Sequence, residues 1–299
     1  MRTSTFENLG INIKEVKTIE DALKVGGLDY TVALKPLYDE DHIEIKDNKL
    51  TVRESDKHKY GIVSDKYTIV QNKDAFGFID YLKDDITFEK IGETSLGMVY
   101  LIASLMPIKI LDDEFKPHLI FRNSHNGRYQ LQTTICPLRM VCQNQFNIAF
   151  RESPNTITIR HSSKAEDRLK EAFQILKGTT DYMKQLNIQA EKWATTRVSN
   201  LEIEKVIDEL FPFKKDMKDL QILRNENKRN QFIQAYKTND NRNFQNTMWG
   251  LINAYSDYIT HKEPDRKTNT AEENRFVSVT FEPKAMMKFI KLVNSKISV

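Results

Sequence analysis

The residues best suited to chemistry gather in one short stretch of the chain, from Phe121 to Arg151. It contains both cysteines, one histidine and four arginines. Between His118 and Ala165, six basic residues meet a single acid, whereas the whole chain balances 45 lysines and arginines against 42 acids. Five of the six bases are arginine, the side chain that makes planar, multidentate contacts with anions. The pattern predicts a local surface for an anionic ligand.

Aromatic and neutral hydrogen-bonding side chains lie among these bases, a mixture typical of proteins that bind single strands of nucleic acid. Such proteins hold the phosphates with cations and stack the bases on flat rings. We therefore expect single-stranded nucleic acid as the partner. The expected contact residues are Arg122, His125, Arg128, Tyr129, Arg139, Asn144, Arg160 and His161.

Two other classes of function stay open for the same residues. A thiolate at Cys142 beside Arg139, with His125 or His161 as its base, would make the protein an enzyme of unrecognised type. A surface that recognises a host factor would make it an interaction protein. No catalytic residue is assigned, because Cys142 leads into an apolar run, the usual setting of a structural cysteine.

Metal, cofactor and disulfide chemistry have no matching motif. The cysteines and histidines lack the spacing of zinc ligands, so we expect no metal site. We also expect no disulfide between Cys136 and Cys142, since two cysteines make no disulfide framework and the composition is that of a reduced compartment. Neither GxxxxGK[ST] nor GxGxxG occurs, and no cofactor is expected.

A hairpin should position the basic stretch. Asn126-Gly127 lies between two runs of β-type residues, and this pair tolerates the positive φ angles of a two-residue turn. Strands are expected near 117–124 and 128–135. The apolar residues from about 141 to 150 are expected to form a helix.

The rest of the chain predicts an α+β fold: an antiparallel sheet with a packed helix in the N-terminal half, and a mainly helical C-terminal half. Residues 1–40 are expected to be an irregular N-terminal arm with one short helix. Residues 41–161 form the antiparallel core, with a helix capped by Asn72. Residues 162–299 form a helical region packed on that core, apart from a short strand at 276–281.

Composition also limits where in the cell the protein can be expected. No apolar run approaches the roughly 20 residues that a membrane span needs. The N-terminal residues lack the apolar segment of a signal peptide. We expect a cytoplasmic protein without membrane association, in the host cytoplasm if a phage encodes it, that is able to form a homo-oligomer.

Several motifs in the chain resemble those of a family of phage/plasmid-like proteins, which is a domain of unknown function. They are Asn123–Gly127, Arg139–Asn144, Arg160-His161, Gly61–Tyr67 with Val70–Asn72, and Met248–Gly250 with Asn253-Ala254. One position departs from the family: Asn126 stands where its members usually carry Asp. The resemblance implies a protein of a mobile element.

The expected architecture is also similar to that of phage single-strand annealing recombinases, which are oligomeric. By this analogy at the level of the fold, the protein would assist annealing or recombination of the element's DNA.

Overall fold

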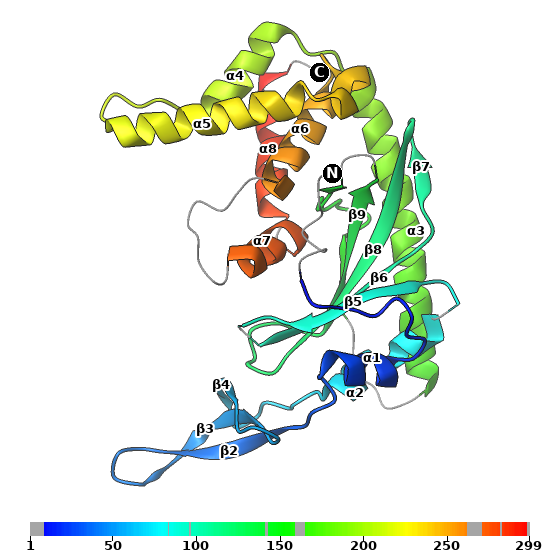
Figure 1. Ribbon diagram of the computed structural model, residues 1–299, viewed down its shortest axis with the longest axis vertical. Helices are drawn as coiled ribbons and strands as arrows, with labels where there is room; N and C mark the ends of the chain where they lie inside the picture. The colour runs from blue at the N-terminus through cyan, green and yellow to red at the C-terminus, as the bar shows by residue number, and fades with distance from the viewer. Residues whose placement is uncertain are drawn as a thin grey trace.

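The computed structural model describes residues 9–82, 84–95, 97–140, 143–158, 165–261, 271–281 and 283–297. Antiparallel sheets with short helices make up the N-terminal half and helices make up most of the C-terminal half, so the predicted α+β class is confirmed (Figure 1). No described helix has both the length and the apolar character needed to cross a membrane.

The larger sheet carries the basic stretch. Its main strands follow the order β1-β5-β6-β8-β9-β10, β7 pairs with β8, β11 pairs with β9, and every pairing is antiparallel. The bounds are Ile11–Asn12 (β1), Thr87–Glu93 (β5), Met98–Ser104 (β6), Ile108–Ile110 (β7), Asp113–Ser124 (β8), Gln132–Arg139 (β9), Asn144–Gln145 (β10) and Thr156–Thr158 (β11).

Both faces of this sheet are covered. Successive strand residues point to opposite faces, so Leu119 joins the main core while Ile120 joins a second, smaller cluster. The helix α3 (Ala165–Thr195) lies on the main-core side, and α7 (Ala271–Thr280) supplies Phe276 to the other side (Figure 1). The strands β6, β8 and β9 are therefore apolar on both faces.

The smaller sheet consists of β2 (Val32–Tyr38), β3 (Glu44–Arg53) and β4 (Lys59–Ser64). The irregular arm expected over residues 1–40 is corrected here, because β2 pairs with β3 from Val32 onward. The short helices α1 (Ile19–Gly26) and α2 (Asn72–Phe76) and the 3₁₀ helix η1 (Gly77–Leu82) connect the two sheets. Asn72 begins α2 but does not cap it; Gln71 occupies the cap position.

The helical half surrounds α6 (Met248–His261), which is buried along most of its length. Its helical neighbours are α3, α5 (Asp219–Tyr236), the 3₁₀ helix η2 (Asn239–Phe244), α7 and α8 (Lys284–Lys296). The helix α4 (Asn200–Leu210) packs on α8. Within this core Trp249 stacks on Trp193 of α3, with ring centroids 6.0 Å apart.

Two local predictions are wrong. The strand expected at 276–281 is helix α7, because Phe276, Val279 and Thr280 fall on one face of a helix and are all buried. The helix expected over 141–150 is β10 followed by irregular chain, for the residues described from 143 onward. Gln145, Phe146, Asn147 and Ile148 are consecutive and all buried, which reflects a segment enclosed from every side.

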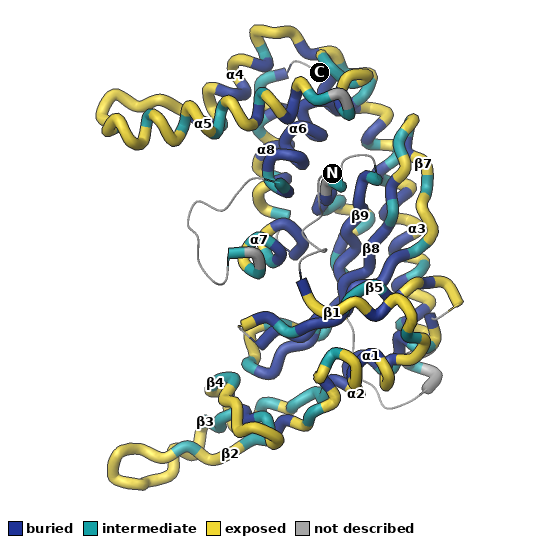
Figure 2. The backbone as a smooth tube through the Cα atoms, viewed as in Figure 1, coloured by how far each residue is buried: buried dark blue, intermediate teal, exposed yellow. Residues whose placement is uncertain are grey.

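The molecule has two projections, at opposite ends of its long axis (Figure 1). One is the β2–β3 hairpin and the other is the N-terminal part of α5 with the loop that precedes it. In Figure 2 the tip of the hairpin and most of the second projection are coloured as exposed. They extend toward the same side of the body.

Candidate functional site

The turn between β8 and β9 frames the candidate site. The last paired residues are Arg122 and Gln132, so residues 123–131 form the connection. Gly127 has a φ of 72°, but Asn126 is not in the left-handed region. Asn126 Oδ1 instead accepts hydrogen bonds from Ser124 Oγ (2.6 Å) and from the backbone N–H of Arg128 (3.0 Å). The two strands are confirmed, but the two-residue turn is wrong, because the Asn126 side chain closes a longer one.

The smaller sheet packs against this turn. Tyr67 Oη donates a hydrogen bond to the Ser124 carbonyl at 3.0 Å. A Cβ added to Gly61 would lie 3.3 Å from Asn126 Cβ, so the absence of a side chain lets the two segments approach closely. The segments Gly61–Tyr67, Val70–Asn72 and Asn123–Gly127, which carry the family resemblance, therefore meet at one place.

His125 is completely buried at this junction. Its Nε2 lies 3.0 Å from Asn72 Oδ1. Asn72 Nδ2 donates to the Leu28 carbonyl, and Asn72 Oδ1 also accepts from Asn123 Nδ2. Because Asn72 presents an acceptor, His125 must carry its proton on Nε2. Nδ1 is then a buried lone pair with no hydrogen-bond partner.

The surroundings keep this imidazole neutral. Burial, and secondly the charge of Arg53, lower the pKa of His125 to about 4. The rings of Tyr60 and Tyr30 lie 5.3 Å and 5.9 Å from it. Burial raises the pKa of Tyr30 to about 12, and the charge of Glu93 adds to that rise. The site therefore presents a neutral base among aromatic rings.

Arg53 ties this cluster together. Its guanidinium lies 4.1 Å from the Tyr30 ring centroid, donates two hydrogen bonds to Tyr60 Oη, and pairs with Glu93 at 2.7 Å. Arg53 and its two tyrosines are not among the residues predicted from the sequence. Tyr60 directly precedes Gly61–Tyr67, which was an available signal, but nothing in the sequence links Tyr30 or Arg53 to His125. We call Tyr30, Arg53, Tyr60, Asn72, Glu93 and His125 the junction cluster.

Arg139 does not share a solvent-facing surface with the other arginines, and this part of the prediction is wrong. It is 2% exposed and pairs with Asp113 at 2.6 Å. Its guanidinium also donates to the backbone carbonyl of Asp240. Burial raises the pKa of Asp113 despite this pair. Arg139 and Asp113 form a structural ion pair in the larger sheet, and the hydrogen bond from Arg139 to Asp240 links this sheet to the segment before α6.

Arg122 and Tyr129 lie together on the face of the larger sheet that packs against Phe276 of α7. Arg128, by contrast, is exposed in the turn. The Arg122 guanidinium lies 4.8 Å from the Tyr129 ring centroid and 4.6 Å from that of Phe281. Of the remaining predicted residues, Arg160, His161 and Cys142 lie outside the described residues. Asn144 belongs to β10, and its side chain is not described. The described geometry thus unites Arg122 with Tyr129 but separates them from His125 and Arg139.

Cys136 is a core residue. It is fully buried in the cluster beside Tyr100, and burial raises the pKa of its thiol to about 12. The thiolate needed for nucleophilic or metal chemistry is therefore suppressed. Within the described part of the chain, no group of three or more histidine, cysteine or carboxylate side chains is placed to hold a metal ion.

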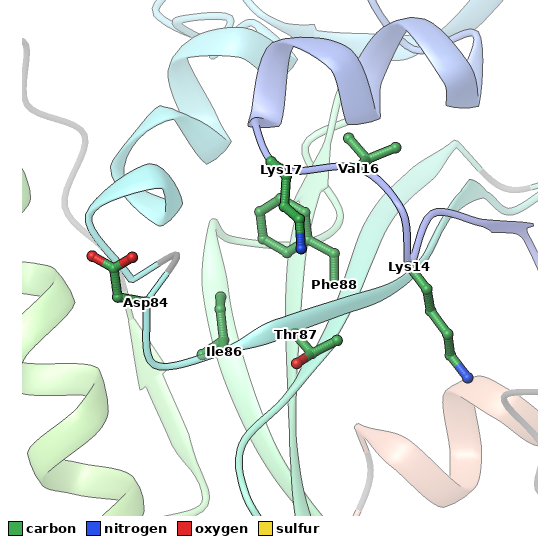
Figure 3. Close-up of a pocket in the computed structure, with 7 residues that line it drawn as sticks. All are labelled: Lys14, Val16, Lys17, Asp84, Ile86, Thr87 and Phe88. Carbon is green, nitrogen blue, oxygen red and sulfur yellow. The ribbon is translucent and has the colours of Figure 1, made fainter.

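Three surface hollows that are lined by described residues lie outside the junction cluster. The first, of 340 Å³, lies between the segment before α1 and the start of β5, and Figure 3 shows Lys17 and Asp84 on different sides of it. The second, of 720 Å³, is mainly apolar and runs between α3 and the segment around Met106. Neither contains a histidine or cysteine among its described lining residues.

The third hollow combines aromatic rings with cations. It measures 440 Å³ and lies among α4, α6, α7 and α8. Tyr255 and Phe289 line it and stack at 4.1 Å with an interplanar angle of 7°. Lys284 and Lys288 of α8 also line it. One further exposed lysine, Lys291, continues the same helical face, since positions i, i+4 and i+7 align.

Fold and site together define an α+β protein with a buried polar junction between two antiparallel sheets and a lysine-bordered aromatic hollow in its helical half. The chain belongs to the family described as domain of unknown function DUF932, whose model matches residues 59–280. No curated protein and no solved structure matches the chain. The matched range includes most of the junction cluster but excludes α8.

Proposed function

We propose that the protein binds single-stranded nucleic acid and assists annealing or recombination of the DNA of a phage or plasmid. The observation that carries the proposal is the aromatic hollow bordered by Lys284 and Lys288. Single-strand binders need cations for the phosphates and flat rings for the bases. The hollow offers cations beside the carboxylate of Glu209, and it is also lined by the rings of Tyr255 and Phe289, which are 9% and 1% exposed and stack on each other.

In this proposal the lysine-bordered hollow takes the place of the basic stretch that the sequence predicted as the binding surface. Arg139 is committed to Asp113, and His125 is buried, so neither offers an atom to a ligand. Lys288 and Lys291 are exposed on α8. The Tyr255 hydroxyl is neutral at pH 7, and burial raises its pKa further, to about 12. The 9% of Tyr255 that is exposed, beside the two lysines, is the part of the ring that a base would contact.

The shape of the molecule adds support. Figure 1 shows α8 on the side of the body toward which both projections extend. A strand that follows α8 would run along the long axis between them. The helix α3, by contrast, covers the opposite side of the larger sheet. Its exposed Lys177 therefore provides a cation remote from the proposed path.

The test is fluorescence anisotropy with labelled single-stranded and duplex oligonucleotides at two salt concentrations. The wild type should bind the single strand more tightly than the duplex. Lys288→Gln with Lys291→Gln should weaken binding and reduce its salt slope by about 0.7 for each phosphate that is no longer neutralised. Lys177→Gln is the matched control and should change neither. Absence of binding at low salt, or equal effects of the two substitution sets, would refute the proposal.

The enzyme hypothesis receives less support from the described residues. It needs Arg139 and His125 beside an accessible nucleophile, but the first is ion-paired and the second fully buried. The proposal therefore assigns no catalytic residue.

A further inference from the structure

The β2–β3 hairpin ends in a tip that is both apolar and acidic. Tyr38, Ile43 and Ile45 are 55%, 64% and 42% exposed. Four carboxylates and no lysine or arginine lie within residues 38–45, which we call the acidic tip. The register pairs Tyr38 with Glu44 and Leu37 with Ile45, so Tyr38 and Ile45 lie on opposite faces of the hairpin. Exposed apolar side chains on a projection mark a surface that binds another protein.

The shape of the acidic tip is fixed by its own hydrogen bonds. Asp39 Oδ1 accepts from the backbone N–H groups of Asp41 and Ile43, and the Asp39 N–H donates to the Ile43 carbonyl. A preformed turn loses little conformational entropy when it docks. The carboxylates of Glu40 and Asp41 point from this turn and are exposed.

The other projection has the complementary composition. Residues 213–224, which we call the basic end, cover the loop after α4 and the first turns of α5. Phe213, Leu220 and Leu223 are 49%, 59% and 52% exposed. Its exposed charged side chains are the bases Lys214, Lys215, Lys218 and Arg224 and the acids Asp216 and Asp219. The Arg229 guanidinium lies 4.9 Å from the Phe213 ring centroid and also pairs with Asp208, which holds that ring in place.

These two surfaces cannot meet within one molecule, because they lie at opposite ends of its long axis (Figure 1). Each carries three exposed apolar side chains, and their net charges are opposite in sign. Opposite potentials steer two surfaces together, and the apolar side chains are removed from water when they meet. The complement of each surface is thus present on another copy of the same chain.

We propose that the acidic tip of one copy docks on the basic end of the next, so that the protein forms a head-to-tail homo-oligomer. Such an interface uses two different patches and repeats, which produces a ring or a filament. A narrow tip buries less than the roughly 1,600 Å² of a standard interface. The association is therefore weak, dependent on protein concentration and reduced by salt.

Sedimentation velocity of the nuclease-treated protein over a range of concentrations tests this inference without any nucleic acid. The wild type should shift from monomer toward larger species as its concentration rises. Glu40→Lys with Asp41→Lys should keep it monomeric, and so should Lys214→Glu with Lys215→Glu. A chain that carries all four reversals together with Glu44→Lys should associate again, because its tip is then +2 (three lysines against Asp39) and its basic end is −2 (four acids against Lys218 and Arg224). Lys177→Glu is the control for a distant charge reversal.

Mixing distinguishes a head-to-tail contact from a symmetric one. A tip variant (Glu40→Gln, Ile43→Ser) and a basic-end variant (Lys215→Gln, Leu220→Ser) should each be monomeric alone. Together they should form a one-to-one dimer that does not grow, because each supplies the one intact surface that the other lacks. A wild type that stays monomeric at every concentration would overturn the inference, as would variants that assemble like the wild type or a mixture that does not pair. None of these results depends on the outcome of the oligonucleotide assay.

Discussion

At the scale of single residues, the side-chain amide of Asn72 determines which imidazole nitrogen of His125 carries the proton. With its Nδ2 directed to the Leu28 carbonyl, Asn72 can offer only an oxygen to the imidazole. The proton is thereby held on Nε2, and the other nitrogen cannot gain a proton without placing a charge in a buried site near Arg53. His125, which the sequence predicted to contact a ligand, is instead a buried residue at the junction of the two sheets.

This burial makes the stability of the protein sensitive to acid. The pKa of His125 falls from its usual 6.5 to about 4 in the folded protein, so the unfolded chain binds the extra proton between these values. Stability should be complete above about pH 6.5 and decrease as the pH falls toward 4, by roughly 3 kcal/mol from this group. Urea unfolding at pH 7, 5.5 and 4 measures the decrease. His125→Asn should reduce it, whereas His42→Asn at an exposed site should not; equal pH dependence of all three proteins would contradict the prediction.

The buried pair of Arg139 and Asp113 yields a second prediction. Removal of one partner leaves the other charge without compensation in a site that is 2% exposed on the arginine side. Arg139→Leu should therefore reduce the free energy of unfolding by about 3–5 kcal/mol. The double variant Arg139→Leu with Asp113→Asn should lose less than the sum of the single losses. A double-mutant cycle from chemical unfolding measures the coupling energy between the two side chains. If the losses of the two single variants simply add in the double variant, the prediction is wrong.

At the scale of elements, two helical glycines with similar sequence settings have different roles. In α6, a Cβ on Gly250 would clash with the backbone oxygen of Phe244, which cannot move aside independently. In α3, a Cβ on Gly178 would meet only the terminal methyl of Ile157 at 2.9 Å, which can rotate. The first glycine is required by the packing of α6 against η2, and the second is not.

The matched alanine substitutions test this difference. Alanine favours a helix over glycine by up to about 1 kcal/mol. Gly178→Ala should change the stability by no more than about this amount. Gly250→Ala should destabilise the protein by roughly 3 kcal/mol or more, because the backbone of η2 must shift. Thermal unfolding followed by circular dichroism gives both values, and a similar effect of the two substitutions would disprove the distinction.

At the scale of the whole molecule, one core joins the sheet to the helices. The main cluster of buried apolar residues extends from Ile13 through Leu119 of β8 to Val293 of α8. Both tryptophans, Trp193 and Trp249, lie in the helical part of this cluster. The larger sheet and the helices should therefore unfold together.

This cooperativity can be measured with two probes. Tryptophan fluorescence reports the helical half, whereas far-ultraviolet circular dichroism reports both halves, and the two unfolding curves should coincide. Leu119→Ala in the sheet and Phe289→Ala in α8 should each destabilise the same single transition, by about 2–5 kcal/mol. Separate transitions for the two probes would show that the halves unfold independently.

The sequence by itself determined what depends on neighbours along the chain. Alternation and helical spacing predicted the α+β class, the strands of the β8–β9 hairpin and the mainly helical C-terminal half, because local pattern reflects which face of an element is buried. The same rule failed for Phe276–Phe281, where a period of two and a helical face both fit six residues. It also failed for Gln145–Ile148, a segment in which consecutive residues are all buried.

Tertiary structure alone decided which polar residues are exposed. Arg128 and Arg139 have the same side chain and lie in the same basic stretch, yet one is exposed in a turn and the other is buried against Asp113. That difference depends on a carboxylate 26 positions away and a carbonyl 101 positions away. The junction cluster likewise brings Arg53 and Asn72 to His125 across two sheets. Hydrogen bonds and ion pairs between distant segments carry no periodic signal, so only the folded chain reveals them.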